Sequence, residues 1–292
     1  MNKKKYSLNF KSDGYIFFDN FPKFGDNYTL QIWINSNSNS FNAWSGLFMR
    51  GDLNTSQGLY WYGKDLCFTN AVSGRVVIDT VDNFPIGSWH NITIAHEKQF
   101  IKYYRDGNFI RKFQVGKSIN SLDDLYIGVW DNYSRYNGKV SEARVWSKAL
   151  NDQEVLFTYN KELTGNNRHL VAHWGINEGN LTEIYDYSNN GYNGRVYGGE
   201  WVEDSPSIYC YKYLIKQDSN YYSIKPEYIQ EEVFKSLILD GGKKPNRDDF
   251  NKYGFNNLND LLIEYNLEKL FKPADILKKI NSGKFHIVMM EM

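Results

Sequence analysis

The sequence has few cysteines and no excess of charge of either sign. Only two of its 292 residues are cysteines, Cys67 and Cys210, which excludes a dense disulfide framework. We expect both thiols to be reduced and at least half-buried. With 34 basic and 34 acidic residues, the formal net charge is zero. The chain therefore has no uniform positive field for neutralising phosphates, and nucleic acid is excluded as an expected partner.

Long apolar runs are missing as well. No stretch of about 18–20 apolar residues occurs, so we expect no membrane insertion. The first residues, MNKKKYSLNF, begin with lysines but continue with polar residues where a secretion signal needs an apolar core. The sequence therefore predicts a protein made in the cytoplasm of its host without a signal peptide.

Aromatic residues are abundant. The chain has 23 Tyr, 18 Phe and 8 Trp, many of them beside Asn, Ser or Gly, which predicts that some rings are exposed. All eight Trp lie within the first 201 residues, and this change in composition predicts a boundary near the polar segment 202–207. We expect one domain over residues 1–206 and a second over 207–292.

The first domain shows the alternation of apolar and polar residues that is typical of strands. YTLQIWIN, residues 28–35, places its Leu and Ile side chains on one face. In residues 100–115, Asp106-Gly107 supplies the positive φ angles of a two-residue hairpin turn. Such segments recur about every dozen residues without long helices between them, which predicts an antiparallel sandwich.

Helices are expected at few places. Within the first domain, Asn151 is a candidate N-cap and Glu154 completes a capping box. The second domain reads as a hairpin over 208–224, several short helices and a closing strand over 284–292. This pattern predicts a small α+β module that attaches or oligomerises the first domain.

Several segments of the first 206 residues follow one another in a characteristic order: YTLQIWIN, LFMRGD, IGSWHNITIAHEKQFIKYYRDGNFI, YIGVW, YNGKVSEARVWSKALNDQEV, HLVAHWGINEG and YDYSNNGYNGRVYGGEW. This order resembles that of laminin-G-like (concanavalin A-like) jelly-roll domains. The resemblance implies a mainly β protein with an antiparallel jelly-roll sandwich. It says little about function, because this fold occurs in lectins, adhesion modules and hydrolases alike.

The second domain contains the segments YLIKQDSNYYSIKPEYI, LDGGKKPNRDDFNKYGFNNLNDLL, PADILKKI and KFHIV. They resemble segments near the C-termini of clostridial phage and prophage tail appendage proteins. The resemblance implies a place in a virion or phage-like particle tail, with other tail or baseplate proteins as partners. It also implies a homo-oligomer, with a trimer favoured, because repeated weak sites gain avidity.

Catalytic motifs are not evident. A retaining glycosidase of this fold needs carboxylates on one strand face, and no Glu-x-Asp-x-Glu spacing occurs. His169 and His173 have the i, i+4 spacing of a zinc helix, but they lie in a predicted strand without the accompanying Glu. We predict no catalytic residues. A depolymerase in the same fold and a purely structural tail module remain alternatives.

The turn at residues 186–194, DYSNNGYNG, contains the oxygen ligands that Ca²⁺ prefers. Asp186 and Asn189 are its candidate ligands. The resemblance implies a structural calcium ion near this turn, with Glu142 assisting, although Ser141 stands where the family commonly has an acidic residue. The alternative is a turn whose side chains bond their own backbone.

Several rings outside the expected core are candidates for binding sugar, because flat aromatic rings stack on the C–H faces of saccharides while polar groups take the hydroxyls. The loop VWDNYSRYNG supplies Trp130, Asp131, Tyr133, Arg135 and Tyr136, and Trp44 and Trp61 are further candidates. The alternative is packing against loops or another subunit. We predict a non-catalytic, carbohydrate-binding receptor-binding protein that recognises bacterial cell-surface polysaccharide during host attachment.

Overall fold

The computed structural model describes residues 5–11, 13–51, 55–70, 74–118, 124–130, 134–161, 163, 167, 169–208, 211–217, 219–224, 235–239, 243–246, 248–249, 252, 254 and 286–291. The chain divides into two compact units. The first consists of Met1–Asn160 with His169–Ser207, and the second of Lys161–Arg168 with Ile208–Met292. The expected boundary after residue 206 lies next to this division.

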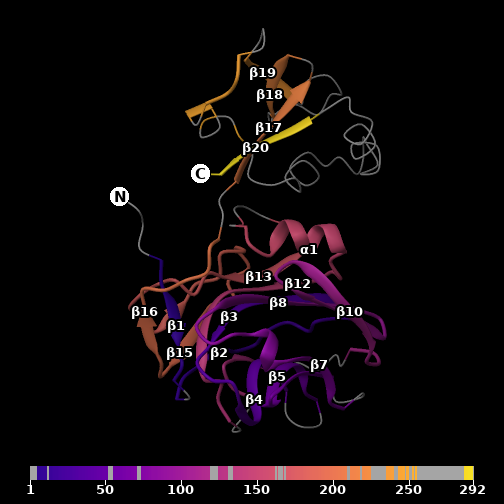
Figure 1. The fold of residues 1–292 in the computed structure, drawn as a ribbon, viewed down its shortest axis with the longest axis vertical. Coiled ribbons are helices and arrows are strands. Elements are labelled where there is room, and N and C mark those ends of the chain that lie inside the picture. Colours follow the sequence, from indigo (N-terminus) through magenta and orange to yellow (C-terminus); the bar gives the residue numbers. More distant parts are fainter. Residues whose placement is uncertain are drawn as a thin grey trace. The chain divides into compact units, whose positions relative to one another are not determined.

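The first unit is a sandwich of two antiparallel sheets (Figure 1). Sheet A has the order β10 (Asn108–Gln114), β9 (Phe100–Arg105), β8 (Trp89–Glu97), β3 (Asn27–Ser36), β12 (Gly138–Trp146), β1 (Ser7–Asn9) and β16 (Glu200–Val202), and β13 (Leu170–Trp174) also pairs with β12. Sheet B has the order β14 (Glu183–Ile184), β15 (Gly194–Tyr197), β2 (Tyr15–Phe18), β11 (Leu125–Ile127), β4 (Phe41–Arg50), β5 (Gln57–Gly63), β6 (Asp65–Thr69) and β7 (Val76–Thr80). The predicted mainly β jelly-roll fold is confirmed.

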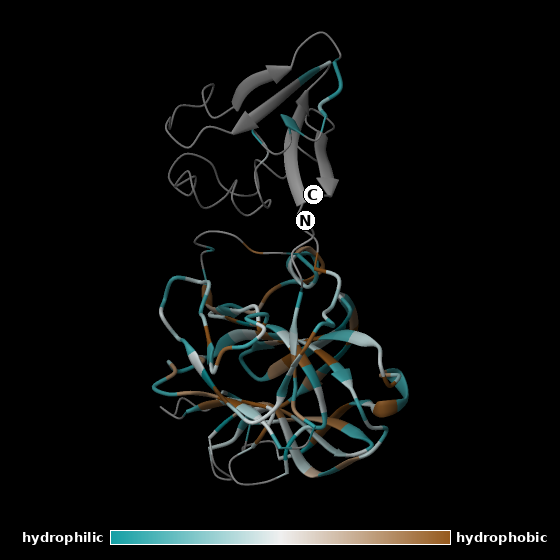
Figure 2. Ribbon diagram, turned by 90° about the vertical axis from the view of Figure 1, so that its left-hand side faces the viewer, coloured by the Kyte–Doolittle hydropathy of each residue, from teal (hydrophilic) through white to brown (hydrophobic). Residues whose placement is uncertain are grey.

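The core lies between the two sheets. From β3, Leu30, Ile32 and Ile34 point inward, as the alternation in the sequence predicts. They meet side chains of sheet B that include Ile16 and Trp61. Hydrophobic and hydrophilic residues accordingly alternate along the strands (Figure 2).

One helix covers part of the outer face of sheet A. It is α1 (Asp152–Thr158), and it begins with the predicted capping box, in which the Asn151 side chain accepts from the Glu154 N–H and the Glu154 carboxylate accepts from the Asn151 N–H. Gln31 of β3 donates to the Thr158 hydroxyl at 3.1 Å. Polar outward side chains of β3 therefore have partners beneath the helix.

The predicted hairpin turn is present between β9 and β10. Asp106 and Gly107 have φ angles of 52° and 77°, the left-handed values that such a turn requires. The short strands β1, β6 and β14 of this unit were not predicted, nor was the 3-10 helix Val81–Asn83 that follows β7.

The second unit contains a four-stranded antiparallel sheet. Its order is β19 (Lys235–Leu239), β18 (Asn220–Ile224), β17 (Tyr211–Gln217) and β20 (His286–Glu291). The predicted hairpin corresponds to β17 and β18, and the predicted closing strand to β20. Of the three short helices expected in this unit, over 248–254, 257–265 and 273–280, the first has Asp248, Asp249 and Lys252 in helical conformation, and the other two lie outside the described residues. In the part of the chain that is described, no helix is long and apolar enough to cross a membrane.

Candidate functional site

Aromatic side chains line the outer face of sheet B on three neighbouring strands. We call this group the aromatic face; it consists of Tyr15 and Phe17 on β2, Tyr126 on β11 and Tyr197 on β15. Tyr197 is paired with Tyr15, and their rings stack with centroids 4.9 Å apart. Tyr126 is paired with Phe17, with ring centroids 5.2 Å apart. The pleat of β2 turns its other two side chains into the core, so these rings point outward.

The aromatic face is accessible to solvent. Tyr197 is 43% exposed, and the other three rings are half-buried. The guanidinium of Arg135 lies over Tyr15, with its Cζ atom 5.2 Å from the ring centroid. Such a group combines flat apolar surfaces with a hydrogen-bond donor. It can stack on an apolar ring face and at the same time donate to an oxygen of the bound molecule.

A second aromatic group, the Trp44 cluster, lies on the same face of sheet B. It consists of Trp44, Tyr60, Tyr62 and Trp130. The Trp44 ring contacts the other three, at centroid distances of 5.5 Å to Tyr60, 5.3 Å to Tyr62 and 5.2 Å to Trp130. Trp44 has a φ of 65°, which is uncommon for a bulky residue. The guanidinium of Arg75 lies 4.3 Å from the centroid of the Tyr62 ring.

Gly46 connects the two groups. It forms a bridge with Arg135 and is the register partner of Tyr60. A Cβ atom at Gly46 would lie 2.2 Å from the carbonyl carbon of Val129, so only glycine lets the segment after β11 lie directly on β4. This segment begins with Trp130 in the Trp44 cluster and reaches Arg135 at the aromatic face.

Comparison with protein families identifies the sandwich. The model of the Concanavalin A-like lectin/glucanases superfamily matches residues 10–156, which is half of the chain. The chain belongs to this superfamily. The matched range contains both aromatic groups except Tyr197.

Solved structures with the superfamily fold resemble this chain at low sequence identity. A protein from Bacteroides ovatus, provisionally named as a carbohydrate binding protein, has a TM-score of 0.55 and 17% identity; the match covers 70% of this chain and 62% of that one. A SAP-like pentraxin from Limulus polyphemus has a TM-score of 0.43 and 16% identity, covering 53% of this chain and 82% of that one. Domains LG4-5 of the mouse laminin alpha1 chain have a TM-score of 0.41 and 17% identity, covering 51% and 45%.

The Bacteroides protein shows that the sandwich fold extends beyond the range matched by the family. This chain spans about three fifths of the length of that protein, so the likeness describes the fold of the shared part. No curated protein matches the sequence.

Two rings that were expected to contact a ligand, Trp61 and Tyr136, are buried in the structure. Trp61 is fully buried, because the alternation of β5 turns it into the core, where it stacks on Phe41 with centroids 4.8 Å apart. Tyr136 is also fully buried, and its hydroxyl lies 3.1 Å from the hydroxyl of Ser36. Neither ring presents a surface to a ligand.

The other predicted ligand residues have different positions. Trp130 is 2% exposed and donates from Nε1 to the Gly51 carbonyl at 3.2 Å, so it supports the Trp44 cluster from within. Trp44 and Arg135 are half-buried at the surface of sheet B. Asp131 and Tyr133 lie outside the described residues.

Sequence reasoning missed the rings of the aromatic face. The alternation in GYIFFDNF could have indicated them, because Tyr15 and Phe17 must lie on one side of a strand and Ile16 and Phe18 on the other. What the sequence could not show is that β11 and β15 lie on either side of β2 and add Tyr126 and Tyr197 to the same face.

The predicted calcium turn is bonded within the protein. The Asp186 carboxylate accepts from the N–H groups of His173, Ser188 and Tyr192 at 3.0, 2.9 and 3.0 Å, and from the Ser188 hydroxyl at 2.9 Å. Asn189 is exposed, with a φ of 70°. In the described residues, no group of three or more His, Cys, Asp or Glu side chains could hold a metal ion. The Asp186 carboxylate is thus already hydrogen-bonded within the protein. Calcium stays a prediction, which melting curves with and without EDTA would test.

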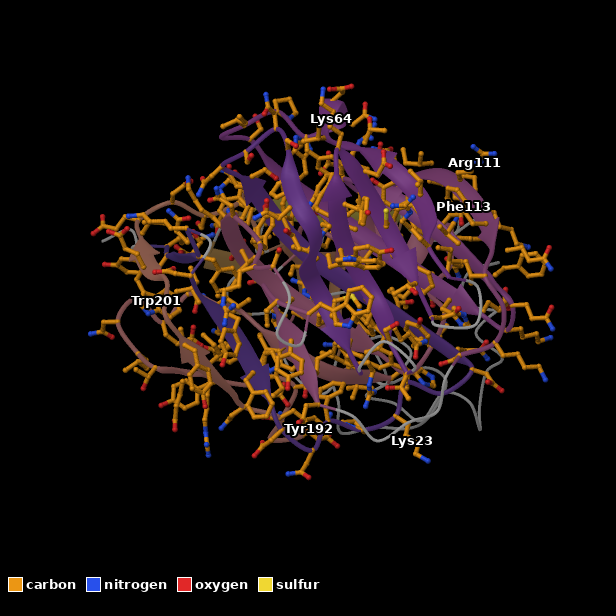
Figure 3. All side chains as sticks on the ribbon, turned by 90° about the horizontal axis from the view of Figure 1, so that it is seen from below. Lys23, Lys64, Arg111, Phe113, Tyr192 and Trp201 are labelled. Carbon is orange, nitrogen blue, oxygen red and sulfur yellow. The ribbon has the colours of Figure 1, made fainter. Side chains whose placement is uncertain are left out.

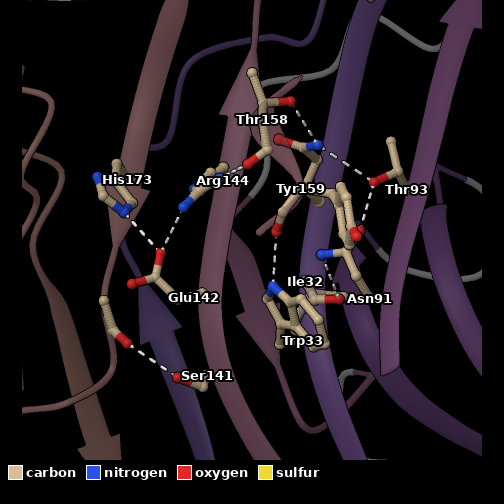
Figure 4. A network of polar contacts seen from close by, with 12 residues as sticks. Ile32, Trp33, Asn91, Thr93, Ser141, Glu142, Arg144, Thr158, Tyr159 and His173 are labelled. Carbon is tan, nitrogen blue, oxygen red and sulfur yellow. Dashed lines mark hydrogen bonds and ion pairs between the residues drawn. The ribbon is translucent and has the colours of Figure 1, made fainter. Parts of the chain in front are cut away.

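Glu142, the third predicted ligand, belongs to a buried charged network on sheet A (Figure 4). Its Oε2 atom lies 2.9 Å from Nη2 of Arg144 and 2.9 Å from Nε2 of His173. Burial opposes the ionisation of Glu142, but His173 and Arg144 outweigh this effect and hold its pKa below the ordinary value. Arg144 also donates to the carbonyl of Thr158 in α1. The carboxylate is therefore committed to tying β12 and β13 together.

Cys67 is a buried free thiol, as predicted. Burial raises its pKa to about 12, so the thiol stays protonated at neutral pH. Cys210 lies outside the described residues.

Proposed function

We propose that this protein is a non-catalytic carbohydrate-binding protein and that its ligand lies on the aromatic face. The observation that carries the proposal is the stacked pair Tyr15 and Tyr197 on an outer sheet face, with Tyr197 exposed, Tyr15 half-buried and the guanidinium of Arg135 over the Tyr15 ring. Sugar rings present apolar C–H faces to such platforms, and their hydroxyls accept from an adjacent guanidinium.

Exposure of these rings needs an explanation, because leaving apolar surface in water forgoes about 25 cal/mol per Å² of burial. The core of the sandwich is already filled by other rings, which include Phe18 and Trp174 at a centroid distance of 4.0 Å. Rings on the outer face therefore add little to folding. A ligand that covers these rings removes their apolar surface from water, and this burial then contributes to the free energy of binding.

The comparisons support the same ligand class. The superfamily is described by its lectins and glucanases, and the Bacteroides protein with the same fold carries a provisional assignment to carbohydrate binding. The bonding of two carboxylates favours binding over catalysis, since buried Glu142 is paired with two side chains and half-buried Asp186 accepts four hydrogen bonds.

The proposed setting is the tail of a phage or phage-like particle, where the protein acts as the receptor-binding protein and recognises bacterial cell-surface polysaccharide. It rests on the resemblance of residues 213–229, 239–262 and 273–288 to tail appendage proteins. In this setting the second unit joins other tail proteins and assembles the chain as a trimer, because three weak saccharide sites bind a repetitive surface more tightly than one. Light scattering of the full chain would measure its mass.

The test compares binding of the full-length protein and two variants to purified clostridial cell walls and to a glycan array. Tyr15→Ala combined with Tyr197→Ala should reduce affinity at least about tenfold, because two stacking surfaces are lost. Tyr187→Ala is the matched control. Tyr187 is 47% exposed and lies beside His173 of sheet A, so its removal should leave binding unchanged.

Three other results would each contradict part of the proposal. Equal binding by the double variant and the wild-type protein would remove the ligand from the aromatic face. Reducing ends released from the walls would show a depolymerase. No saccharide bound by the folded wild-type protein would favour a purely structural module.

A further inference from the structure

We propose that the aromatic face and the Trp44 cluster together form a site for an acidic saccharide, one that carries carboxylate or phosphate groups. This inference rests on the proposed function and adds the chemical class of the ligand. Its basis is that two arginines on this side of sheet B lie on the aromatic rings rather than beside carboxylates.

Arg135 is the first of these arginines. Its guanidinium lies over the Tyr15 ring, and it forms no ion pair with any other residue that the structure describes. The backbone bridge between Arg135 and Gly46 holds the residue against β4. The side chain is half-buried and already ordered in the free protein, so less conformational entropy is lost when a ligand binds.

Arg75 is the second. Its Cζ atom lies 4.3 Å from the centroid of the Tyr62 ring, and like Arg135 it has no carboxylate partner in the described part of the chain. A guanidinium on a ring face keeps its planar N–H groups available at the edge, where they match the paired oxygens of a carboxylate or phosphate. Both aromatic groups therefore have a cation at the surface.

Two described carboxylates lie close to these groups, Asp13 two residues before Tyr15 and Asp65 as the register partner of Tyr62, and neither forms an ion pair with Arg135 or Arg75. The other acidic residues of the sheet lie farther away. Asp19 follows β2 and Asp124 precedes β11, so both are at the strand ends away from Tyr15. Glu183 of β14 is the register partner of Arg195 and lies at the edge of the sheet. Within the described residues, the guanidiniums of Arg135 and Arg75 therefore have no carboxylate as an ion-pair partner.

The overall charge of the chain cannot produce a preference for acidic ligands. Basic and acidic residues are equal in number, and the formal net charge is zero. A measured preference for acidic saccharides would therefore come from local cations and would decrease as salt increases. Such a preference could not be explained by non-specific attraction to a positively charged protein, because the chain has no net charge.

The experiment uses the full-length protein and a glycan array that carries matched pairs. One set pairs uronic acid glycans with their methyl esters, and a second pairs phosphorylated glycans with their dephosphorylated forms, which distinguishes the two sources of negative charge. We expect the wild-type protein to prefer the acidic member of at least one set about tenfold, a difference equivalent to ~1.4 kcal/mol.

Three variants assign the preference. Arg135→Gln and Arg75→Gln should each reduce the ratio of acidic to neutral binding about threefold to tenfold. Arg111→Gln is the matched control, because Arg111 lies over Phe113 at 5.3 Å on β10 of sheet A, at the opposite edge of the sandwich from Trp201 (Figure 3). This control should leave the ratio unchanged.

The results separate the two proposals. Equal binding of acidic and neutral members overturns the acidic class and leaves carbohydrate binding intact. If the ratio of acidic to neutral binding is unchanged in both Arg135→Gln and Arg75→Gln, the assignment to these arginines is overturned. A lower ratio in Arg111→Gln would overturn it as well. Binding to no glycan at all, with the wild-type protein shown to be folded by its melting transition, means that the proposed function itself fails.

Discussion

At the scale of single residues, neighbouring rings on β5 point to opposite faces of sheet B. In GLYWYG, alternation separates Trp61 from Tyr60 and Tyr62, and the structure places Trp61 in the core and the two tyrosines outside it. Trp130 follows the same logic. It was expected to bind ligand because it lies in a polar loop, but it packs against Trp44, a contact that is distant in the sequence and leaves no local pattern.

The five tryptophans in the strands of sheet A differ in burial. Trp33, Trp146 and Trp174 are buried, whereas Trp89 and Trp201 are half-buried. Trp89 donates from Nε1 to Asp204 at 3.0 Å, so its polar atom has a partner at the surface. Strand alternation predicts the side on which such a ring lies, and burial depends on what the rest of the chain places there.

The charged network of Glu142 gives a prediction about stability. Replacing Glu142 with Gln leaves the buried guanidinium of Arg144 without its carboxylate, and we expect the free energy of unfolding at pH 7 to fall by about 3 kcal/mol. The pKa of Glu142 is lower in the folded protein than its ordinary value of 4.5. Its contribution is therefore present above that value and is lost as the pH falls through the folded pKa.

Urea unfolding of the wild-type protein and Glu142→Gln between about pH 3 and pH 7 would measure this effect. The difference between the two should narrow as the pH falls. Glu183→Gln, which changes an exposed carboxylate, is the control and should unfold like the wild-type protein. A difference that stays constant over the whole range would mean that the charge of Glu142 does not stabilise the fold.

At the scale of elements, local signals were most reliable where a short motif determines the backbone. The capping box at α1 and the Asp106-Gly107 turn are both present as predicted, because each depends on residues within a few positions of one another. The strand β6 (Asp65–Thr69) was missed. It is only five residues long, and its pairing with β5 is what makes it a strand.

The cap of α1 can be tested alone. Asn151→Ala removes the side chain that accepts from the Glu154 N–H at 3.0 Å, and we expect it to lower the free energy of unfolding by about 1 kcal/mol. Gln153→Ala, at an exposed position in the first turn, is the matched control and should have little effect. Equal stability of both variants would show that the capping box contributes nothing measurable.

At the scale of the whole molecule, the superfamily fold could be predicted from the order of its strands, whereas the ligand face could not. The aromatic face is assembled from β2, β11 and β15, whose residues lie at positions 15–18, 125–127 and 194–197. Only the sheet order brings these segments together. The sequence indicated that the chain has more rings than a core needs, and the structure shows where some of them lie.

The most direct test of the central claim is amide hydrogen exchange of the full-length protein with and without soluble wall polysaccharide. The proposed site predicts slower exchange in the bound protein at β2, β11 and β15, and in the segment of β4 around Gly46. It predicts no change in β9 and β10 at the far edge of sheet A. Protection confined to sheet A, with unchanged exchange across the aromatic face, would contradict the account.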